Sequence, residues 1–200
     1  MLRLAIEAAR RGRSVAVIDL DPQTTAANWS DRRAKDRPAV VSCQVSRLPQ
    51  VLATAEKEGA ELAIIDTPGK STDAAIAASR SADLVLLPVQ PQLYDIETLP
   101  SLKDVLSLAG NPPARVLVNR TPVQGHRHLE TQEAAAQQYG LEVCPVVLFA
   151  RAAHGDAANV GLAAAELDPE GKAGREMREL YSYIAIALKG GRHGQQKHTG

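Results

Sequence analysis

The chain has 200 residues, of which 44% are hydrophobic and 23% are charged. This length and composition are typical of one folded domain with a sizeable core, and its 23 basic and 23 acidic side chains cancel. A balanced charge excludes a global electrostatic field, so any contact with an anion or a nucleic acid must come from a local patch.

The helices can be predicted in chain order from their apolar spacing and their ends. Residues 1–12 form an amphipathic helix that ends at Arg10, Arg11 and Gly12. No N-cap residue precedes this helix, and we expect that something normally stands before Met1. Further helices are predicted over residues 48–59, 95–110, 128–140 and 171–188, with Pro100 kinking the second of these four. After Leu188 the chain has no apolar residue, so residues 1–188 are expected to form a single domain and residues 189–200 a disordered polar tail.

Short, almost continuous apolar runs alternate with these helices, and each run is a predicted strand. The runs are VAVI (residues 15–18), AVVSCQV (39–45), LAII (62–65), DLVLLPV (83–89), RVLV (115–118) and CPVVLF (144–149). Strands that are apolar on both faces and alternate with helices indicate a parallel sheet covered on both sides. The predicted fold class is therefore α/β, with a doubly wound, mostly parallel sheet.

Carboxylates stand at the ends of two of these strands. Asp19 and Asp21 follow the strand at residues 15–18, and Asp66 follows the strand at residues 62–65. Ligands of open parallel sheets bind beyond the carboxyl ends of the strands. Burying three unpaired carboxylates together is costly, and a divalent cation, a nucleotide phosphate complex with its lysine or a shared water network would remove that cost. The charges suit a phosphate and magnesium site at the sheet edge.

Five further segments can be compared with known families: VIDLDPQTTAANWS, LAIIDTPG, SADLVLLPVQPQLYDI, VLVNR and AAAELDPEGKAGREMREL. Together they resemble the ParA family of partition ATPases, the deviant Walker branch that also contains MinD. The most similar type is the small plasmid ParA that lacks an N-terminal DNA-binding domain, and the resemblance extends to about Leu188. It implies a P-loop NTPase or Rossmann-like nucleotide-binding domain, with ATP and Mg²⁺ as cofactors and phosphoryl transfer to water as the reaction.

The resemblance also implies a role for individual residues. Asp21 matches the aspartate that orients or activates the attacking water, and Asp19 matches its neighbour in the same switch. Asp66 matches the Walker B carboxylate, which reaches magnesium through water. The second switch loop corresponds to Thr67, Pro68 and Gly69, and the residues near the adenine base correspond to Asn119, Pro88 and Pro91.

One family motif has no counterpart in this chain. The Lys-Gly-Gly-x-Gly-Lys-Thr loop, which cradles the nucleotide phosphates, does not occur in the 200 residues. In relatives this loop stands directly before the helix that matches residues 2–11, and its strand lies in the centre of the sheet. We therefore expect a sheet without that first strand, in which residues 62–65 and 83–87 have unpaired backbone groups. Our hypothesis is a gene truncated at its start, or a full protein that begins about 15 residues upstream of Met1, with the family's phosphate loop in that segment.

The resemblance further implies a cytoplasmic, nucleoid-associated protein that segregates plasmid or chromosome DNA. Its partners would be a second copy of the chain on ATP binding, a ParB-type centromere-binding protein, and DNA bound without sequence preference. The basic residues proposed to contact DNA phosphates are Arg151, Arg175, Arg178 and Lys189. Glu176 and Glu179 lie among them, so ordinary solvated helix charges are the alternative interpretation. The polar tail has no apolar face, and attachment to a membrane is not expected.

Two other functions remain open at this point: a catalytically inactive ParA-like interaction module, and an accessory ATPase of conjugation or cell division. A metal site at His126 and His128 is not expected, because no third ligand follows at a recognisable spacing. Cys43 and Cys144 fit neither a disulfide framework nor a metal motif. They are interpreted as small core residues in a reducing cytoplasm.

Overall fold

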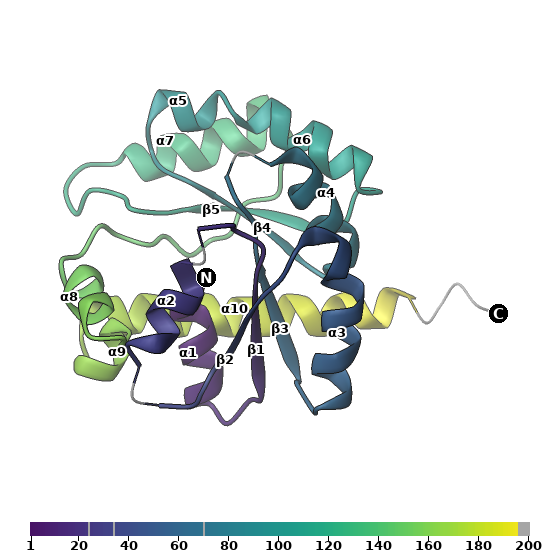
Figure 1. The fold of residues 1–200 in the computed structure, drawn as a ribbon. Coiled ribbons are helices and arrows are strands. Elements are labelled where there is room, and N and C mark those ends of the chain that lie inside the picture. The colour runs from purple at the N-terminus through teal and green to yellow at the C-terminus, as the bar shows by residue number, and fades with distance from the viewer. Residues whose placement is uncertain (24, 34, 70, 196–200) are drawn as a thin grey trace. The chain divides into compact units, whose positions relative to one another are not determined.

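The structure is a computed structural model that describes residues 1–23, 25–33, 35–69 and 71–195. The chain divides into two compact units, one formed by residues 1–81 and 152–178 and the other by residues 82–151 and the chain from Glu179 onward. In both units strands alternate with helices, and every pairing between the named strands is parallel (Figure 1). This confirms the α/β class, with parallel sheets flanked by helices.

The first unit contains a sheet with the strand order β2-β1-β3. In it, β1 (Val15–Asp19) pairs on one side with β2 (Ala39–Ser42) and on the other with β3 (Leu62–Asp66). All five residues of β1 are buried, as expected for an apolar run in the middle of a sheet. These strands follow the three apolar runs predicted from the sequence, except that β2 ends at Ser42.

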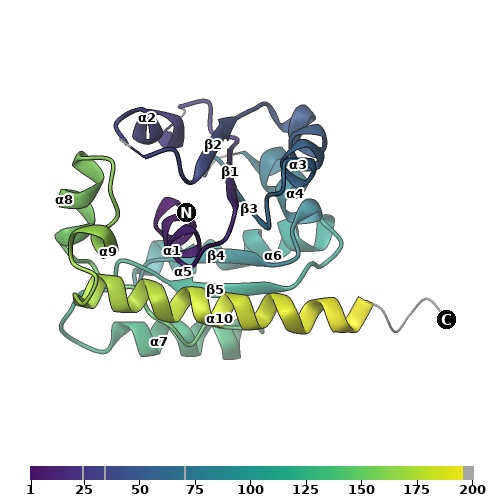
Figure 2. The same cartoon turned by 90° about the horizontal axis from the view of Figure 1, so that it is seen from below.

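Helices cover both faces of this sheet (Figure 2). α1 (Leu2–Arg10) lies on one face, and α3 (Leu48–Lys57) and α4 (Thr72–Ser81) lie on the other. On the α1 face, Ile6 packs with Trp29 of α2 (Thr25–Asp31) and with Ala163. On the opposite face, Leu48 packs with Ile18 of β1. The apolar side chains therefore form two separate layers, one on each face of the sheet.

The remaining elements of the first unit are short, apart from the last helix. They are the 3₁₀ turn η1 (Val45–Arg47), α8 (Ala153–Asn159), α9 (Ala164–Leu167) and the beginning of α10 (Lys172–Gln195). Met177 on α10 is buried. The first unit thus combines the N-terminal part of the chain with a segment from near its C-terminus.

The second unit is built on the parallel pair of β4 (Val85–Val89) and β5 (Ala114–Val118). Its helical elements are α5 (Leu93–Ile96), α6 (Leu99–Leu108), α7 (Arg127–Glu133) and the π-helical segment η2 (Ala134–Gln138). A core joins the two strands to α6 and η2, and its buried members are Leu87, Val89, Leu99, Leu106, Val116, Val118 and Ala135. The later part of α10 belongs to this unit, where the Tyr183 hydroxyl accepts a hydrogen bond from Arg115 Nε at 3.1 Å.

Two predicted elements have a different form in the structure. Residues 144–149 do not form a strand, and this region makes only isolated bridges, between Val116 and Val143 and between Thr121 and Phe149. Pro145 has no backbone N–H to donate to a ladder, which accounts for the interruption. The helix predicted over residues 95–110 is divided into α5 and α6, with Pro100 in the first turn of α6 rather than at a kink. Proline is tolerated there because an N–H in the first turn has no partner within the helix.

The last helix is longer than predicted. α10 continues to Gln195, so residues 189–195 are helical and not a disordered tail. Once a helix has formed, each further residue adds a hydrogen bond without needing an apolar face, and the polar composition therefore does not end it. Residues 196–200 of the predicted tail lie outside the described residues. Among the residues that the structure describes, no helix is long and apolar enough to cross a membrane.

Candidate active site

Asp19 and Asp66 are neighbours at the carboxyl end of the first unit's sheet. The parallel register pairs residues 15–19 of β1 with residues 62–66 of β3, so the two aspartates are direct partners. Immediately beyond them, the N–H of Leu20 donates a hydrogen bond to the carbonyl of Asp66 at 2.9 Å. The aspartates at the ends of these two neighbouring strands are therefore adjacent in the structure, as predicted.

The carboxylate of Asp19 holds the loop that follows β1. Its side chain is 1% exposed, with Oδ1 accepting a hydrogen bond from the N–H of Asp21 and Oδ2 from the N–H of Ala26, both at 3.0 Å. Ala26 lies in the first turn of α2, where backbone N–H groups have no partner within the helix. Asp19 thus connects the end of β1 to the start of α2. These contacts indicate that Asp19 positions the loop between them.

Asp21 is less buried than Asp19 and lies on the loop that Asp19 holds. Its Oδ1 accepts a hydrogen bond from the N–H of Gln23 at 2.9 Å. This contact is local, between residues two positions apart, as in a turn closed by an aspartate side chain. Of the two aspartates in the predicted first switch, Asp21 is therefore the one whose carboxylate is more accessible.

The pKa of Asp66 reflects its burial first and its charged neighbours second. Burial raises the pKa of Asp66, the Met1 ammonium acts in the opposite direction, and the negative charges of Asp19 and Asp21 raise it further. The net result is a pKa above the usual aspartate value. A bound cation or a proton would reduce the repulsion between Asp66 and the other two carboxylates.

The carboxylates fit magnesium only in a particular way. Within the described ranges, no group of three or more His, Cys, Asp or Glu side chains is arranged to hold a metal ion directly. Magnesium usually keeps several water ligands and is bound through one or two carboxylates together with substrate phosphates. Asp66 can serve in this way through water, whereas a site made entirely of protein ligands is not present in the described part of the chain.

The predicted second switch forms the connection between β3 and α4. Thr67 and Pro68 are half-buried there, and Gly69 is exposed. The loop ends at Ser71, whose N–H donates to the carbonyl of Pro68 and whose Oγ accepts from the N–H of Ala74, both at 3.3 Å. Ser71 was not among the predicted site residues, although a serine directly before a helix is a recognisable N-cap signal.

The residues predicted to lie near the base gather at one end of the strand pair in the second unit. The N–H of Asn119 donates to the carbonyl of Val89 at 2.8 Å, and Asn119 Oδ1 accepts from the N–H of Arg120 at 2.9 Å. Pro88 is exposed on β4, and Pro91 is buried just after it. Sequence reasoning missed Asp95, whose Oδ2 accepts a hydrogen bond from the N–H of Gln90 at 2.7 Å and holds this loop.

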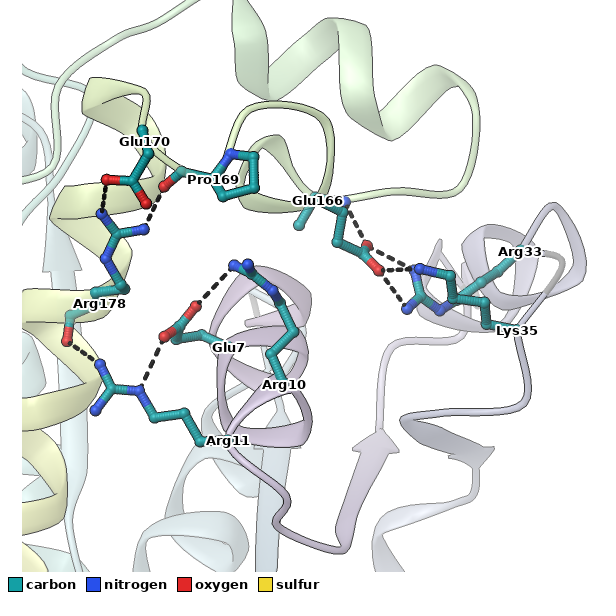
Figure 3. Close-up of polar contacts among 10 residues, drawn as sticks. Glu7, Arg10, Arg11, Arg33, Lys35, Glu166, Pro169, Glu170 and Arg178 are labelled. Atoms are coloured by element: carbon teal, nitrogen blue, oxygen red, sulfur yellow. Dashed lines mark hydrogen bonds and ion pairs between the residues drawn. The ribbon is translucent and has the colours of Figure 1, made fainter.

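The four residues predicted to contact DNA are divided between the units. Arg175 and Arg178 belong to the first, and Arg151 and Lys189 to the second. Arg175 and Lys189 are exposed, but Arg178 bonds to the carbonyl of Pro169 and lies 3.6 Å from Glu170 (Figure 3). The guanidinium of Arg151 lies 5.4 Å from the ring centre of Phe149. The structure does not bring the four together within one unit.

The similarities of this chain to known proteins lie in its structure. No protein-family model and no curated protein matches the sequence. Among solved structures, MinD from Pyrococcus horikoshii complexed with Mg-ADP matches with a TM-score of 0.67 and 15% identity, over 91% of this chain and 87% of that chain. An ATP complex of a McdA variant from Cyanothece matches with a TM-score of 0.65 and 15% identity, over 94% of this chain and 90% of that chain.

A plasmid partition protein provides a further structural match. It comes from Borrelia burgdorferi and has a TM-score of 0.62 and 13% identity, over 92% of this chain and 90% of that chain. Identities this low show a shared fold and not a shared activity. The chain therefore has the fold of the MinD, McdA and ParA ATPases, which supports the family resemblance of its sequence.

Proposed function

We propose that this chain is a ParA-type ATPase whose catalytic carboxylates lie at the carboxyl end of β1 and β3. The observation that carries the proposal is the register that places Asp19 beside Asp66. The negative charge of Asp21 also acts to raise the pKa of Asp66. Such a cluster at the carboxyl edge of a parallel sheet, in a fold shared with ATPases, supports phosphoryl transfer.

Each carboxylate has a separate task in this proposal. Asp66 holds magnesium through water, Asp21 orients the attacking water, and Asp19 holds the loop that carries Asp21. Bound magnesium supplies neutralisation of the charge on the transferred phosphoryl group. Thr67, Pro68 and Gly69 contact the terminal phosphate as the second switch. In the second unit Asn119 reads the adenine edge, with Pro88 and Pro91 beside the base.

The biological role that we propose is DNA partition. ATP binding would drive dimerisation and DNA binding without sequence preference in the cytoplasm, and a ParB-type partner would stimulate hydrolysis and release from the nucleoid. The sequence resemblance to ParA partition ATPases supports this role, and a plasmid partition protein shares the fold. We assign DNA contact to Arg151, Arg175, Arg178 and Lys189, and the exposure of Arg175 and Lys189 is in keeping with such contact.

Titration calorimetry with ATP and magnesium tests the proposed site. The wild-type chain is expected to bind, and Asp66→Asn is expected to weaken binding by about tenfold or more, because it removes a carboxylate that acts on the metal. Asp21→Ala is expected to retain binding but to lower the hydrolysis rate by about 10²-fold or more. Asp73→Asn is the matched control, because Asp73 is an exposed aspartate on α4. Absence of wild-type binding, or equal binding by Asp66→Asn, would contradict the proposal.

One sequence observation favours a second candidate, a catalytically inactive interaction module. The Lys-Gly-Gly-x-Gly-Lys-Thr loop that cradles phosphates does not occur in the 200 residues. A module of this kind would unfold cooperatively at the same temperature with and without Mg–ATP, whereas a ligand that binds the folded state raises that temperature. A MinC:MinD cell division complex is also among the structural matches, so an accessory role in cell division or conjugation is a further alternative. The identity of the neighbouring genes would distinguish these roles from partition.

A further inference from the structure

Both ends of α2 are held by side chains from other parts of the first unit. At its beginning, the N–H of Ala26 donates to Asp19 at the end of β1. Just beyond its end, the guanidinium of Arg33 meets the carboxylate of Glu166 on α9 (Figure 3). α2 is therefore a short rigid connection between the carboxylate loop and a segment 133 positions away in sequence from Arg33.

The contact between Arg33 and Glu166 is bidentate and buried. Arg33 Nη1 and Nη2 donate to the two carboxylate oxygens at 2.8 Å each, with the side chains 4% and 6% exposed. Two parallel bonds between planar groups fix orientation as well as distance. Arg33 also donates to the carbonyl of Gly161 at 3.0 Å and to that of Arg37 at 2.8 Å. A flexible surface pair would not make so many simultaneous contacts.

Glu166 is in turn held by its own segment. The N–H of Ala163 donates to Glu166 Oε2 and the Lys35 ammonium to Oε1, both at 3.0 Å. Burial alone would raise the pKa of Glu166, but the hydrogen bonds from Arg33, Ala163 and Lys35 lower it to about 2. The carboxylate is thus ionised throughout the physiological range.

Packing around the ion pair leaves α2 little freedom to shift. Arg33 lies over the ring of Trp29, 5.1 Å from its centre, and Trp29 is buried against Ile6 and Ala163. Gly161 approaches the chain next to Arg33 so closely that a β-carbon placed on it would lie 2.7 Å from the carbonyl oxygen of Arg32. A displacement of Glu166 would therefore be passed to the helix and not absorbed by a void.

We propose that Glu166 is a positioning residue for the candidate active site, acting through Arg33 and α2 on the loop that carries Asp19 and Asp21. The proposal has two parts. The mechanical part, that Glu166 holds the loop in place, depends only on the contacts above. The chemical consequence, an effect on hydrolysis, rests on the proposed ATPase function. The segment from Gly161 to Glu166 thereby becomes part of the machinery that orients Asp21, although Glu166 itself lies on a different element from the reacting groups.

Amide hydrogen exchange of the full chain tests the mechanical part. Glu166→Gln keeps the side-chain volume but removes the charge that pairs with Arg33. We expect the amides of Asp21 and Ala26, which donate to Asp19, to lose protection by about tenfold or more. Faster exchange confined to Ala163, with Asp21 and Ala26 unchanged, would overturn the proposal.

Glu7→Gln is the matched control. Glu7 on α1 is another buried carboxylate, 3% exposed, and it pairs with two arginines, Arg10 at 3.4 Å and Arg11 at 3.0 Å (Figure 3). Neither of these two contacts involves the loop after β1. Glu7→Gln should leave Asp21 and Ala26 protected once the change in global stability is subtracted, whereas the same loss in both variants would show mere destabilisation and overturn the proposal.

A second variant covers the case in which Glu166→Gln does not fold. Arg33→Lys keeps the positive charge but replaces the planar fork by a point charge, which cannot make both bonds to Glu166 and the two carbonyl contacts together. We expect a smaller loss of protection at Asp21 and Ala26, of about threefold. No change at these amides in a folded Arg33→Lys protein would count against the positioning role.

Nucleotide hydrolysis forms a separate arm of the experiment. If the wild-type chain hydrolyses ATP, Glu166→Gln should lower kcat about tenfold with little change in KM, because the loop is misaligned while the binding groups remain. An unchanged kcat would overturn the chemical consequence of the proposal. If the wild-type chain does not bind Mg–ATP, the proposed function fails, and the exchange result still decides whether Glu166 positions the loop.

Discussion

Asp19 and Asp21 stand two residues apart, and the structure gives their carboxylates different surroundings. Asp19 accepts two backbone hydrogen bonds in a buried position, whereas Asp21 accepts one at a more accessible position. We therefore expect Asp19→Ala to lower the free energy of unfolding by about 2 to 3 kcal/mol, since it leaves two backbone donors without a partner. Asp21→Ala should cost less than about 1 kcal/mol.

Urea unfolding of both variants at neutral pH checks this difference. Asp19→Asn is a useful intermediate, because an amide oxygen can replace only one of the two acceptors. It should therefore fall between wild type and Asp19→Ala. Equal costs for Asp19→Ala and Asp21→Ala would mean that Asp19 does not hold the loop.

Asp66 provides a prediction about pH. Its pKa is raised above the usual aspartate value of 3.8 by burial and, against the effect of the Met1 ammonium, by the charges of Asp19 and Asp21. The folded protein therefore binds the Asp66 proton more tightly than the unfolded chain does. The Asp66 contribution to the free energy of unfolding must then decrease as the pH rises from 3.8 through the raised pKa.

Replacing Asp66 by asparagine removes this titration. Asp66→Asn should be more stable than wild type at neutral pH, with the advantage shrinking as the pH falls toward 3.8. Urea unfolding of both proteins between these pH values measures it. If the two free energies of unfolding differ by the same amount at every pH, the charged form of Asp66 is not destabilised in the folded protein. Magnesium would then have no unfavourable charge to neutralise at Asp66.

At the scale of elements, the connection between α8 and α9 depends on a glycine. Gly161 has a φ of 70°, and a β-carbon there would lie within 3 Å of backbone atoms of Arg32 and Arg33. Gly59, after α3, also has a positive φ, of 87°, but a β-carbon there would meet no atom within 4 Å. Both positions therefore require a left-handed backbone conformation, which favours glycine. Only Gly161 also lacks the space for a side chain.

Alanine substitution at the two glycines separates these effects. Gly59→Ala is expected to cost about 1 to 2 kcal/mol of stability, from the left-handed backbone alone. Gly161→Ala should cost about 1 to 3 kcal/mol more, because backbone atoms must move to admit the methyl group. Chemical denaturation of the two variants gives the comparison. Similar costs would mean that α2 and the α8–α9 segment can separate easily, which would also weaken the case for Glu166.

At the scale of the whole molecule, the strands differ in how many neighbours they have. Among the described residues β1 lies between β2 and β3, whereas β3 and β4 are end strands of their sheets. These two are the strands beside which the sequence predicts a missing strand. At an unpaired strand edge the backbone N–H and C=O groups have no partner strand. Such a strand opens locally more easily than one that is paired on both sides.

Hydrogen exchange over the whole chain should reproduce this pattern. The amides of Val17 and Ile18, both buried in β1, are expected to exchange at the rate of global unfolding. The slowest amides of β3 should exchange at least about tenfold faster, because this strand is paired on one side in the described structure. Equal protection of β1 and β3 would show that another segment or a second copy covers the edge of β3 in solution.

Much of this fold could be predicted from local patterns. The apolar runs at residues 15–18, 62–65 and 115–118 became strands, and positive φ values occur at Gly12, Gly59, Gly110 and Gly140, where helices were predicted to end. Strands and helix ends of this kind depend on residues that are close in sequence, so they can be predicted from the sequence alone. The strand predicted at residues 144–149 was wrong, because pairing depends on a partner and Pro145 limits it.

The sequence by itself determined that the aspartates of two strand ends would meet, since parallel strands place their carboxyl ends at one edge of a sheet. It also carried the resemblance to ParA ATPases, whose fold the structure shares. Only the tertiary structure decided that Asp19 is a buried cap for α2 and that Glu166 pairs with Arg33. The physical reason is that a buried polar side chain takes its role from the partner that folding brings to it, and no local pattern records a partner 133 positions away.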